Sequence, residues 1–172
     1  MLTALSLIDF GVGDVIVPKQ EKRSIPTQLD GFQAPEVSAY SIETTVAEKL
    51  DAILSLMEYS SRMKDYYDIF YLANKFDFDG DILSRAMTET FSNRDREFTV
   101  QQFDQLLSLD IDAAMKRKWL AFLKKVKRAE PDFADVLKTL SDFLHDILAS
   151  VVSGQEFKKF WKASDGCWIG EF

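Results

Sequence analysis

The sequence predicts an α+β fold that is predominantly helical, with short N-terminal strands followed by a helical bundle. From Ser41 onward, apolar residues recur with the three- and four-residue spacing of amphipathic helices. The first forty residues differ, because they are partly alternating and hold three of the four prolines. A chain of 172 residues with 47% hydrophobic and 28% charged residues is long enough to bury one core and is not typical of disorder.

The N-terminal region predicts three short extended segments. Residues 2–10 are apolar and partly alternating, and residues 15–17 form a second short apolar run that Pro18 ends. We expect residues 18–36 to be an irregular connection and residues 37–40 to be extended. Strands this short and this few need partners, so an exposed strand edge predicts a possible homodimer.

The remaining chain predicts six helices. Ser41 is a good N-cap for the first of them, and Pro131 suits the first turn of the last. The aromatic segment 157–172 has no clear period. The expected helices span residues 42–57, 64–75, 80–91, 98–107, 111–128 and 131–153.

Composition excludes several classes of protein. The net charge of -7 argues against a large, uniformly basic nucleic-acid-binding surface. A single cysteine, Cys167, and a single histidine, His145, exclude an intrachain disulfide and metal sites rich in cysteine or histidine. No apolar run approaches about 20 residues, and the N-terminal ten residues lack a basic n-region, so we expect no membrane contact and a cytoplasmic protein.

Three charges fall on faces that the helical pattern assigns to the core. Lys49 lies inside the apolar arc of the first helix, Asp65 lies inside that of the second, and Asp68 lies at its edge. A buried charge costs several kcal/mol unless it is paired, so we expect these residues to pair across the helical hairpin. Two interpretations stay open, a structural ion pair and a site where the lysine meets a phosphate.

A basic segment stands out in the fifth expected helix. A solvated face and a contact surface for an RNA backbone are both consistent with it. We expect His145 to be a surface residue and Cys167 a packing residue, and we assign neither a chemical role. The basic residues are Lys116, Arg117, Lys118, Lys124, Lys125, Lys127 and Arg128.

The two helices that carry these charges also carry a family signature. AEKLDA at residues 47–52 and SRMKDYYDI at residues 61–69 resemble the paired motifs of the AbiEii/AbiGii-type nucleotidyltransferase toxins. The segment IDFGVGDV at residues 8–15, with Pro18, is similar to a motif that precedes them in that family. Further similar positions are residues 76–80, Thr90, Phe91, Arg94, Trp119, Phe122, Leu123, Phe143 and Leu144.

The resemblance implies a polymerase-β-like nucleotidyltransferase that moves a nucleoside monophosphate from an NTP, using Mg²⁺ held by carboxylates. It implies a toxin of toxin–antitoxin and abortive-infection systems, opposed by a cognate antitoxin, and some relatives modify tRNA ends. Lys49 matches the motif lysine expected near the nucleotide phosphates, and Asp65 and Asp68 match the acidic motif, with Asp68 the site-facing carboxylate. Lys64 is either a further phosphate contact or a surface lysine. Asp9 is either a late active-site carboxylate or a residue of a strand-end turn.

One departure from the family pattern bears on activity. The glycine-rich element and the D-x-D metal pair of the family are absent from these 172 residues. The D-x-D strings at residues 77–79 and 110–112 lie at helix boundaries and are interpreted as caps.

We therefore expect the C-terminal part of such an enzyme, inactive alone, with a strand remnant at residues 1–40 and a helical domain at residues 41–172. Mg²⁺ is expected for the complete enzyme only. The alternative is a non-catalytic helical interaction module derived from the same family.

Overall fold

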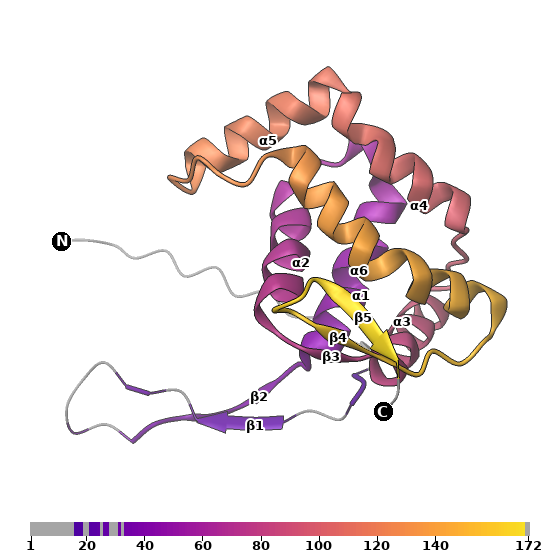
Figure 1. Cartoon of the computed structure of the whole chain (residues 1–172). Helices are drawn as coiled ribbons and strands as arrows, with labels where there is room; N and C mark the ends of the chain where they lie inside the picture. The colour runs from indigo at the N-terminus through magenta and orange to yellow at the C-terminus, as the bar shows by residue number, and fades with distance from the viewer. Residues whose placement is uncertain (1–15, 19–20, 25, 28–30, 32, 171–172) are drawn as a thin grey trace.

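The computed structural model describes residues 16–18, 21–24, 26–27, 31 and 33–170. Most of these residues are helical, and the strands are short, so the predicted mainly helical α+β fold is confirmed (Figure 1). The helices are α1 (Ile42–Leu56), α2 (Met63–Lys75), α3 (Gly80–Asn93), α4 (Val100–Leu107), α5 (Ala113–Lys125) and α6 (Phe133–Ser153), with 3₁₀ turns at Met57–Tyr59 and Ser108–Ile111. The strands are β1 (Glu21–Ser24), β2 (Glu36–Ala39), β3 (Phe78–Asp79), β4 (Lys159–Lys162) and β5 (Cys167–Gly170).

Side-chain caps fix where the helices begin. The Ser41 hydroxyl accepts a hydrogen bond from the Thr44 amide at the start of α1, as its sequence position predicts. The last aspartate of each D-x-D string, Asp79 and Asp112, likewise accepts bonds from amides in the first turn of α3 and α5. The interpretation of both strings as caps is therefore confirmed for those residues. Helix α6 begins at Phe133 with Asp132 as its N-cap, two residues later than predicted, so the expected place of Pro131 in the first turn is wrong.

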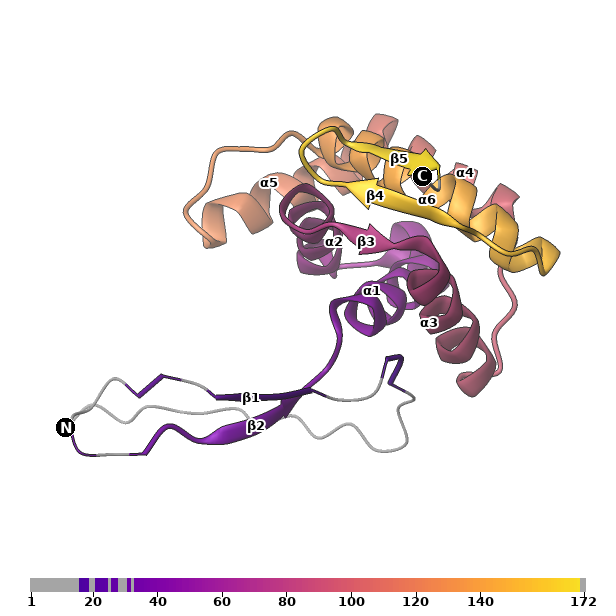
Figure 2. The same ribbon diagram turned by 60° about the horizontal axis from the view of Figure 1, so that its bottom comes forward.

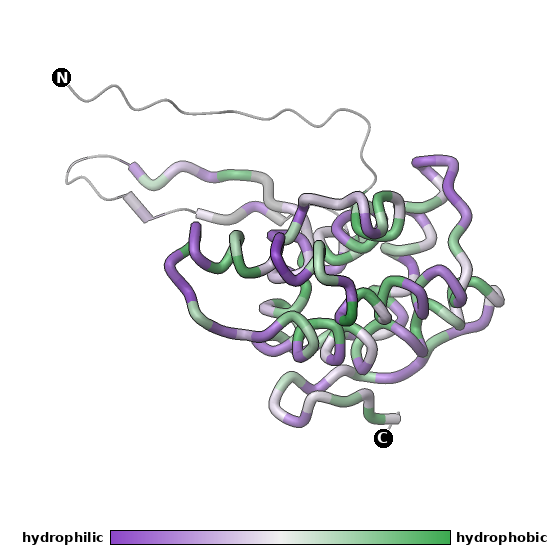
Figure 3. The backbone as a smooth tube through the Cα atoms, turned by 90° about the horizontal axis from the view of Figure 1, so that it is seen from above, coloured by the Kyte–Doolittle hydropathy of each residue, from purple (hydrophilic) through white to green (hydrophobic). Residues whose placement is uncertain are grey.

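Helix α6 is the centre of the core. It packs against α2, α3 and α4, and its apolar stripe is buried almost throughout. Polar and apolar residues alternate along the helices when the chain is coloured by hydropathy, as expected of amphipathic helices around one core (Figure 3). Among the described residues, no helix is both long and apolar enough to cross a membrane.

The aromatic C-terminal segment, which the sequence left unassigned, forms a hairpin. Strands β4 and β5 pair antiparallel, and β3 joins the edge of β4 with Phe78 opposite Trp161. The indole of Trp161 donates to the Ala73 carbonyl at 2.7 Å, and the indole of Trp168 donates to the Phe143 carbonyl at 2.9 Å. These bonds anchor the hairpin to α2 and α6. Cys167 is exposed, so its predicted packing role is wrong.

The N-terminal region differs from the prediction. Strands β1 and β2 form an antiparallel ribbon that projects from the helical body (Figures 1 and 2). Strand β1 lies inside residues 18–36, for which we expected no strand, whereas β2 matches the predicted segment 37–40 within one residue. Ile16 and Val17 are not in a strand, and the predicted strand 2–10 lies outside the described residues.

The backbone of Val17 is hydrogen-bonded to two side-chain hydroxyls at the start of α1. Its amide donates to Thr44 Oγ1 at 2.9 Å, and its carbonyl accepts from the Ser41 hydroxyl at 2.7 Å. The residues that begin the first helix thus also fix the chain that leads into the ribbon.

Candidate functional site

The α1–α2 hairpin brings the three predicted charges into direct contact. Lys49 Nζ donates to Asp65 Oδ1 at 2.9 Å and to Asp68 Oδ2 at 2.6 Å. Lys49 lies in the middle of α1, and the two aspartates lie one turn apart near the start of α2. The predicted pairing across the hairpin is therefore confirmed, and one ammonium group bridges two carboxylates.

Two exposed cations complete this cluster. Arg62 Nε donates to Asp65 Oδ2 at 2.5 Å, and Lys64 Nζ donates to Asp68 Oδ2 at 2.6 Å. Both side chains are more than half exposed, whereas that of Asp65 is 6% exposed. Three cations therefore face two carboxylates, so the cluster carries a formal charge of +1. We call these five residues the Lys49 cluster.

Burial and pairing act in opposite directions on Lys49. Burial alone would lower the pKa of its ammonium group, but the hydrogen bonds to Asp68 and Asp65 outweigh burial and raise the pKa above the ordinary value of 10.5. The side chain of Lys49 is 17% exposed. Lys49 is therefore a fixed positive charge at physiological pH that solvent can still reach.

The start of α2 adds to the positive character of the cluster. The N-cap position is Arg62, and within the described chain its side chain makes no capping bond to the helix. The first backbone N–H groups of a helix carry the positive end of its dipole, and this end attracts anions. The exposed Arg62 and Lys64 flank this end. The arrangement can therefore bind an anionic oxygen, and it holds no nucleophile or general base that is free of a cation.

The carboxylates of the cluster do not fit a magnesium ion. Mg²⁺ needs oxygen ligands that are free to coordinate it, and Asp65 and Asp68 both accept hydrogen bonds from cations. The described residues also contain no group of three or more histidine, cysteine, aspartate or glutamate side chains that could hold a metal ion. Asp9, the remaining candidate carboxylate, lies outside the described residues.

A second buried ion cluster lies on the opposite side of α1, and sequence reasoning missed it. Asp51 accepts from Arg94 Nη1 at 2.6 Å and lies 3.3 Å from Arg96 Nε, and its side chain is 2% exposed. Glu48 lies 3.7 Å from Arg94. These bonds join α1 to the C-terminal end of α3, so α1 is fixed on both sides by charge.

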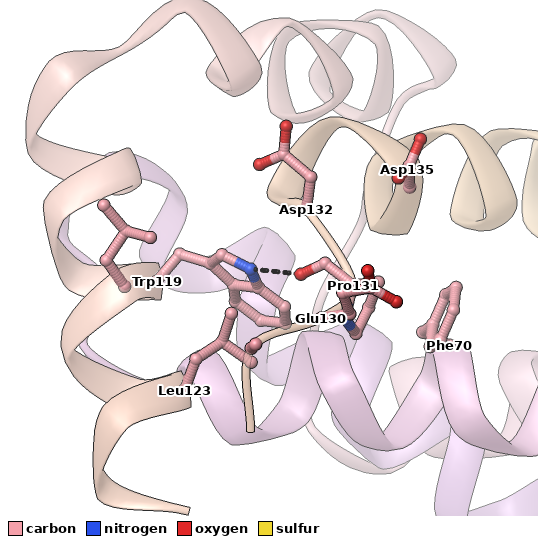
Figure 4. A pocket seen from close by; sticks show the side chains of 9 residues that line it. Phe70, Trp119, Leu123, Glu130, Pro131, Asp132 and Asp135 are labelled. Atoms are coloured by element: carbon pink, nitrogen blue, oxygen red, sulfur yellow. Dashed lines mark hydrogen bonds between the residues drawn. The ribbon is translucent and has the colours of Figure 1, made fainter. Parts of the chain in front are cut away.

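A hollow of the described surface lies away from both ion clusters. A cavity of about 570 Å³ lies between α2, α5 and the start of α6, with Phe70, Trp119 and Leu123 on its apolar side and acidic residues at its rim (Figure 4). The Trp119 indole donates to the Pro131 carbonyl at 2.9 Å beside it. No residue of the Lys49 cluster lines this cavity. The charged site and the cavity are therefore separate features.

Comparison with known families identifies a match. The family model described as "Nucleotidyl transferase AbiEii toxin, Type IV TA system" matches residues 6–144, which is well over half of the chain and includes the whole Lys49 cluster. No curated protein and no solved structure matches the chain. A type IV toxin–antitoxin family implies an antitoxin as partner. The chain therefore belongs to the AbiEii family of nucleotidyl transferase toxins of type IV toxin–antitoxin systems.

Proposed function

We propose that this chain supplies the phosphate-binding lysine of an AbiEii-type nucleotidyltransferase toxin, which transfers a nucleoside monophosphate from an NTP to an acceptor such as tRNA. Lys49 binds the phosphates, and Asp65 and Asp68 hold its ammonium group in place. The observation that carries this proposal is the contact of one Lys49 Nζ with both carboxylates, at 2.9 and 2.6 Å.

The geometry leaves Lys49 one donor for a ligand. An ammonium group has three N–H donors, and two of them are directed at Asp65 and Asp68. The third is assigned to a phosphate oxygen, which the partly exposed side chain allows. With both carboxylates holding the ammonium group, the lysine is positioned before the nucleotide arrives, which lowers the ordering cost of binding.

Lys64 and Arg62 are proposed as secondary phosphate contacts. Their side chains are 73% and 57% exposed, so each can exchange its bond to a carboxylate for a bond to a phosphate at little cost. Lys64 also lies in the first turn of α2, where the helix dipole favours a bound anion.

The transfer itself is assigned to residues beyond this cluster. Phosphoryl transfer needs carboxylates that hold metal ions at the reacting phosphate, and the two aspartates of the cluster are occupied by cations. We therefore expect this chain alone to bind NTP weakly and to label no acceptor. Incubation with labelled NTP, Mg²⁺ and tRNA is the direct measurement, and appreciable labelling would overturn the expected inactivity.

One observation favours the alternative of a non-catalytic interaction module. Every charge of the Lys49 cluster already has a partner, which is also what a structural clasp between α1 and α2 requires. A clasp has no need of an exposed lysine at its rim. The two functions therefore differ in whether Lys64 contributes to nucleotide binding.

Calorimetric titration of the full chain with NTP tests this difference. We expect Lys64→Gln to weaken binding by about three- to tenfold, as loss of one exposed charged contact implies. Lys138→Gln is the matched control, because Lys138 makes the same i,i+4 bond at 2.6 Å, to Asp142, and is 75% exposed. Absence of NTP binding by the unmodified chain, or equal effects of both substitutions, would support the module instead.

A further inference from the structure

The basic residues are concentrated in one segment of the chain, and the net charge of -7 does not show this. Residues 113–128 contain seven of the 21 lysines and arginines and no aspartate or glutamate. The other 14 basic residues share the rest of the chain with all 28 acidic residues. A positive segment on an acidic protein creates a local field that attracts polyanions, although the protein as a whole repels them.

Most of these cations have no partner in the described structure. Lys118 is the exception, because its Nζ donates to the carbonyls of Glu58 and Ser60 at 2.7 and 2.9 Å. The others are exposed, and among the described residues none has a carboxylate within ion-pair distance. They are Lys116, Arg117, Lys124, Lys125, Lys127 and Arg128, which we call the α5 basic face.

Helix α5 holds Lys116, Arg117, Lys124 and Lys125 of this face in a fixed orientation, and Lys127 and Arg128 follow its end at Lys125. Met115, Trp119 and Leu123 are buried along one side of the helix, so Arg117 and Lys124 point to the opposite side. These two residues are about 10 Å apart along the axis at 1.5 Å per residue. Figures 1 and 2 show α5 at the outer edge of the helical body, where a large ligand can reach it.

The chemistry of the face selects the kind of polyanion. Single strands are bound by exposed aromatic rings that stack on bases, whereas on α5 Trp119 is 1% exposed and Phe122 is partly buried against it. Base edges are read by asparagine, glutamine and arginine, and residues 113–128 contain no asparagine or glutamine, so only Arg117 and Arg128 belong to this group. Contact with phosphates is the chemistry that all six cations of the face share, and phosphates are spaced along a duplex.

We propose that the α5 basic face docks the phosphate backbone of an RNA stem. The choice of RNA rests on the acceptor named in the proposed function, whereas the phosphate chemistry rests on the face alone. Docking here is independent of sequence and is separate from the Lys49 cluster. The face would hold the stem of the acceptor RNA while the end of that RNA reaches a transfer site.

The test is binding of the full chain to a fluorescently labelled RNA hairpin, measured by anisotropy over a range of salt concentrations without NTP or Mg²⁺. The triple variant Arg117→Gln, Lys124→Gln, Arg128→Gln removes three charges from the face. We expect its affinity at low salt to fall at least about tenfold. The plot of log K against log salt concentration should become less steep by about 3, close to one unit for each phosphate contact removed. Circular dichroism and thermal unfolding check that the variant folds.

The matched control is the triple variant Arg85→Gln, Lys138→Gln, Lys158→Gln. It removes the same number of charges from residues that pair with Asp81, Asp142 and Glu156, so the net charge of the two variants is equal. We expect its affinity to stay within about twofold of the unmodified chain, since local charge decides phosphate contact. Equal losses in both variants would overturn the proposal, because they would reflect net charge only.

Three other ligands separate the alternatives. Equal affinity for a DNA duplex of the same sequence would overturn the choice of RNA. Binding to anionic phospholipid vesicles but not to RNA would assign the face to a lipid surface. A dimer in light scattering that the face variant dissociates, without RNA binding, would assign it to a second copy. RNA binding needs no NTP, so its failure and a failed NTP titration are distinguishable.

Discussion

Replacing Lys49 with methionine is the sharpest test of the Lys49 cluster. Methionine keeps most of the apolar stem and removes the ammonium group, so the packing of α1 against α2 is nearly preserved. Asp65 and Asp68 then lose a partner at 2.9 and 2.6 Å, while Asp65 keeps Arg62 and Asp68 keeps Lys64. The experiment therefore measures how much the bridging charge contributes beyond the two rim pairs.

The structure sets the size of the effect. Removing one partner of a fully buried ion pair costs about 3–5 kcal/mol, because the other charge is left without compensation. Here the Lys49 and Asp68 side chains are 17% and 24% exposed, and each aspartate keeps a second cation. We therefore expect a loss of about 2–3 kcal/mol in the free energy of unfolding at neutral pH, or about 5–10 °C in Tm.

Urea and thermal unfolding, followed by tryptophan fluorescence, measure this loss. Lys64→Met is the matched control, because it deletes the same charge from the same cluster at a side chain that is 73% exposed. Its expected cost is below about 1 kcal/mol, as for other surface pairs. If Lys49→Met costs no more than Lys64→Met, the bridging lysine is not a buried clasp and the reasoning fails.

The pH dependence of the same difference gives a second check. The pKa of Lys49 is raised in the folded protein, so its contribution is complete below the ordinary value of 10.5 and is lost as the pH rises through the folded value. The stability gap between the unmodified chain and Lys49→Met should therefore be constant from neutral pH to about pH 10 and shrink above it. Burial also raises the pKa of the Tyr66 phenol, but this change is common to both proteins and cancels in the difference.

Three further substitutions test the packing of the helical body, each by urea or thermal unfolding. Tyr66→Phe should stabilise the protein by about 1 kcal/mol, because the buried hydroxyl has no hydrogen-bond partner among the described atoms; a loss would show that the hydroxyl is satisfied. Gly80→Ala should cost more than about 2 kcal/mol, since its Cβ would lie 2.6 Å from the Lys159 carbonyl oxygen, whereas Gly170→Ala meets nothing within 4 Å and should cost far less. Asp51→Asn should cost about 1–3 kcal/mol by weakening both arginine contacts, and an unchanged midpoint would contradict its role in joining α1 to α3.

Helices with a strong apolar stripe were predictable, because the three- and four-residue spacing of their apolar residues is itself the pattern of an amphipathic helix. Helices α2 and α6 match the predicted ranges within two residues at either end. The boundaries of α5 were less predictable, because its basic C-terminal residues continue the helical pattern although the helix ends at Lys125. Lys127 there adopts a φ of 56°, a left-handed conformation that the sequence pattern does not mark.

The short strands carried weaker signals. The residues of β1 read EKRS, a polar segment without the alternation that identifies a half-buried strand, and its partner β2 is what makes it a strand. The C-terminal hairpin depends on Trp161 and Trp168 finding carbonyl acceptors on α2 and α6, residues distant in the sequence. Contacts of this kind are tertiary, and local propensity does not contain them.

The two ion clusters of α1 show why one was predictable and the other was not. Lys49 lies within an arc of large apolar residues, so the sequence alone shows a charge on a helix face that is expected to be buried. Asp51 lies about 180° from Ile42 on the same helix, among Thr44 and Ala47, and this second face has no large apolar residue to reveal that it is buried. Small residues allow α3 to approach closely, and the burial of Asp51 comes from that approach. A helix packed on two sides thus displays in its sequence only the side that is lined by large residues, and the motif AEKLDA directs Lys49 at α2 but both Glu48 and Asp51 at the end of α3.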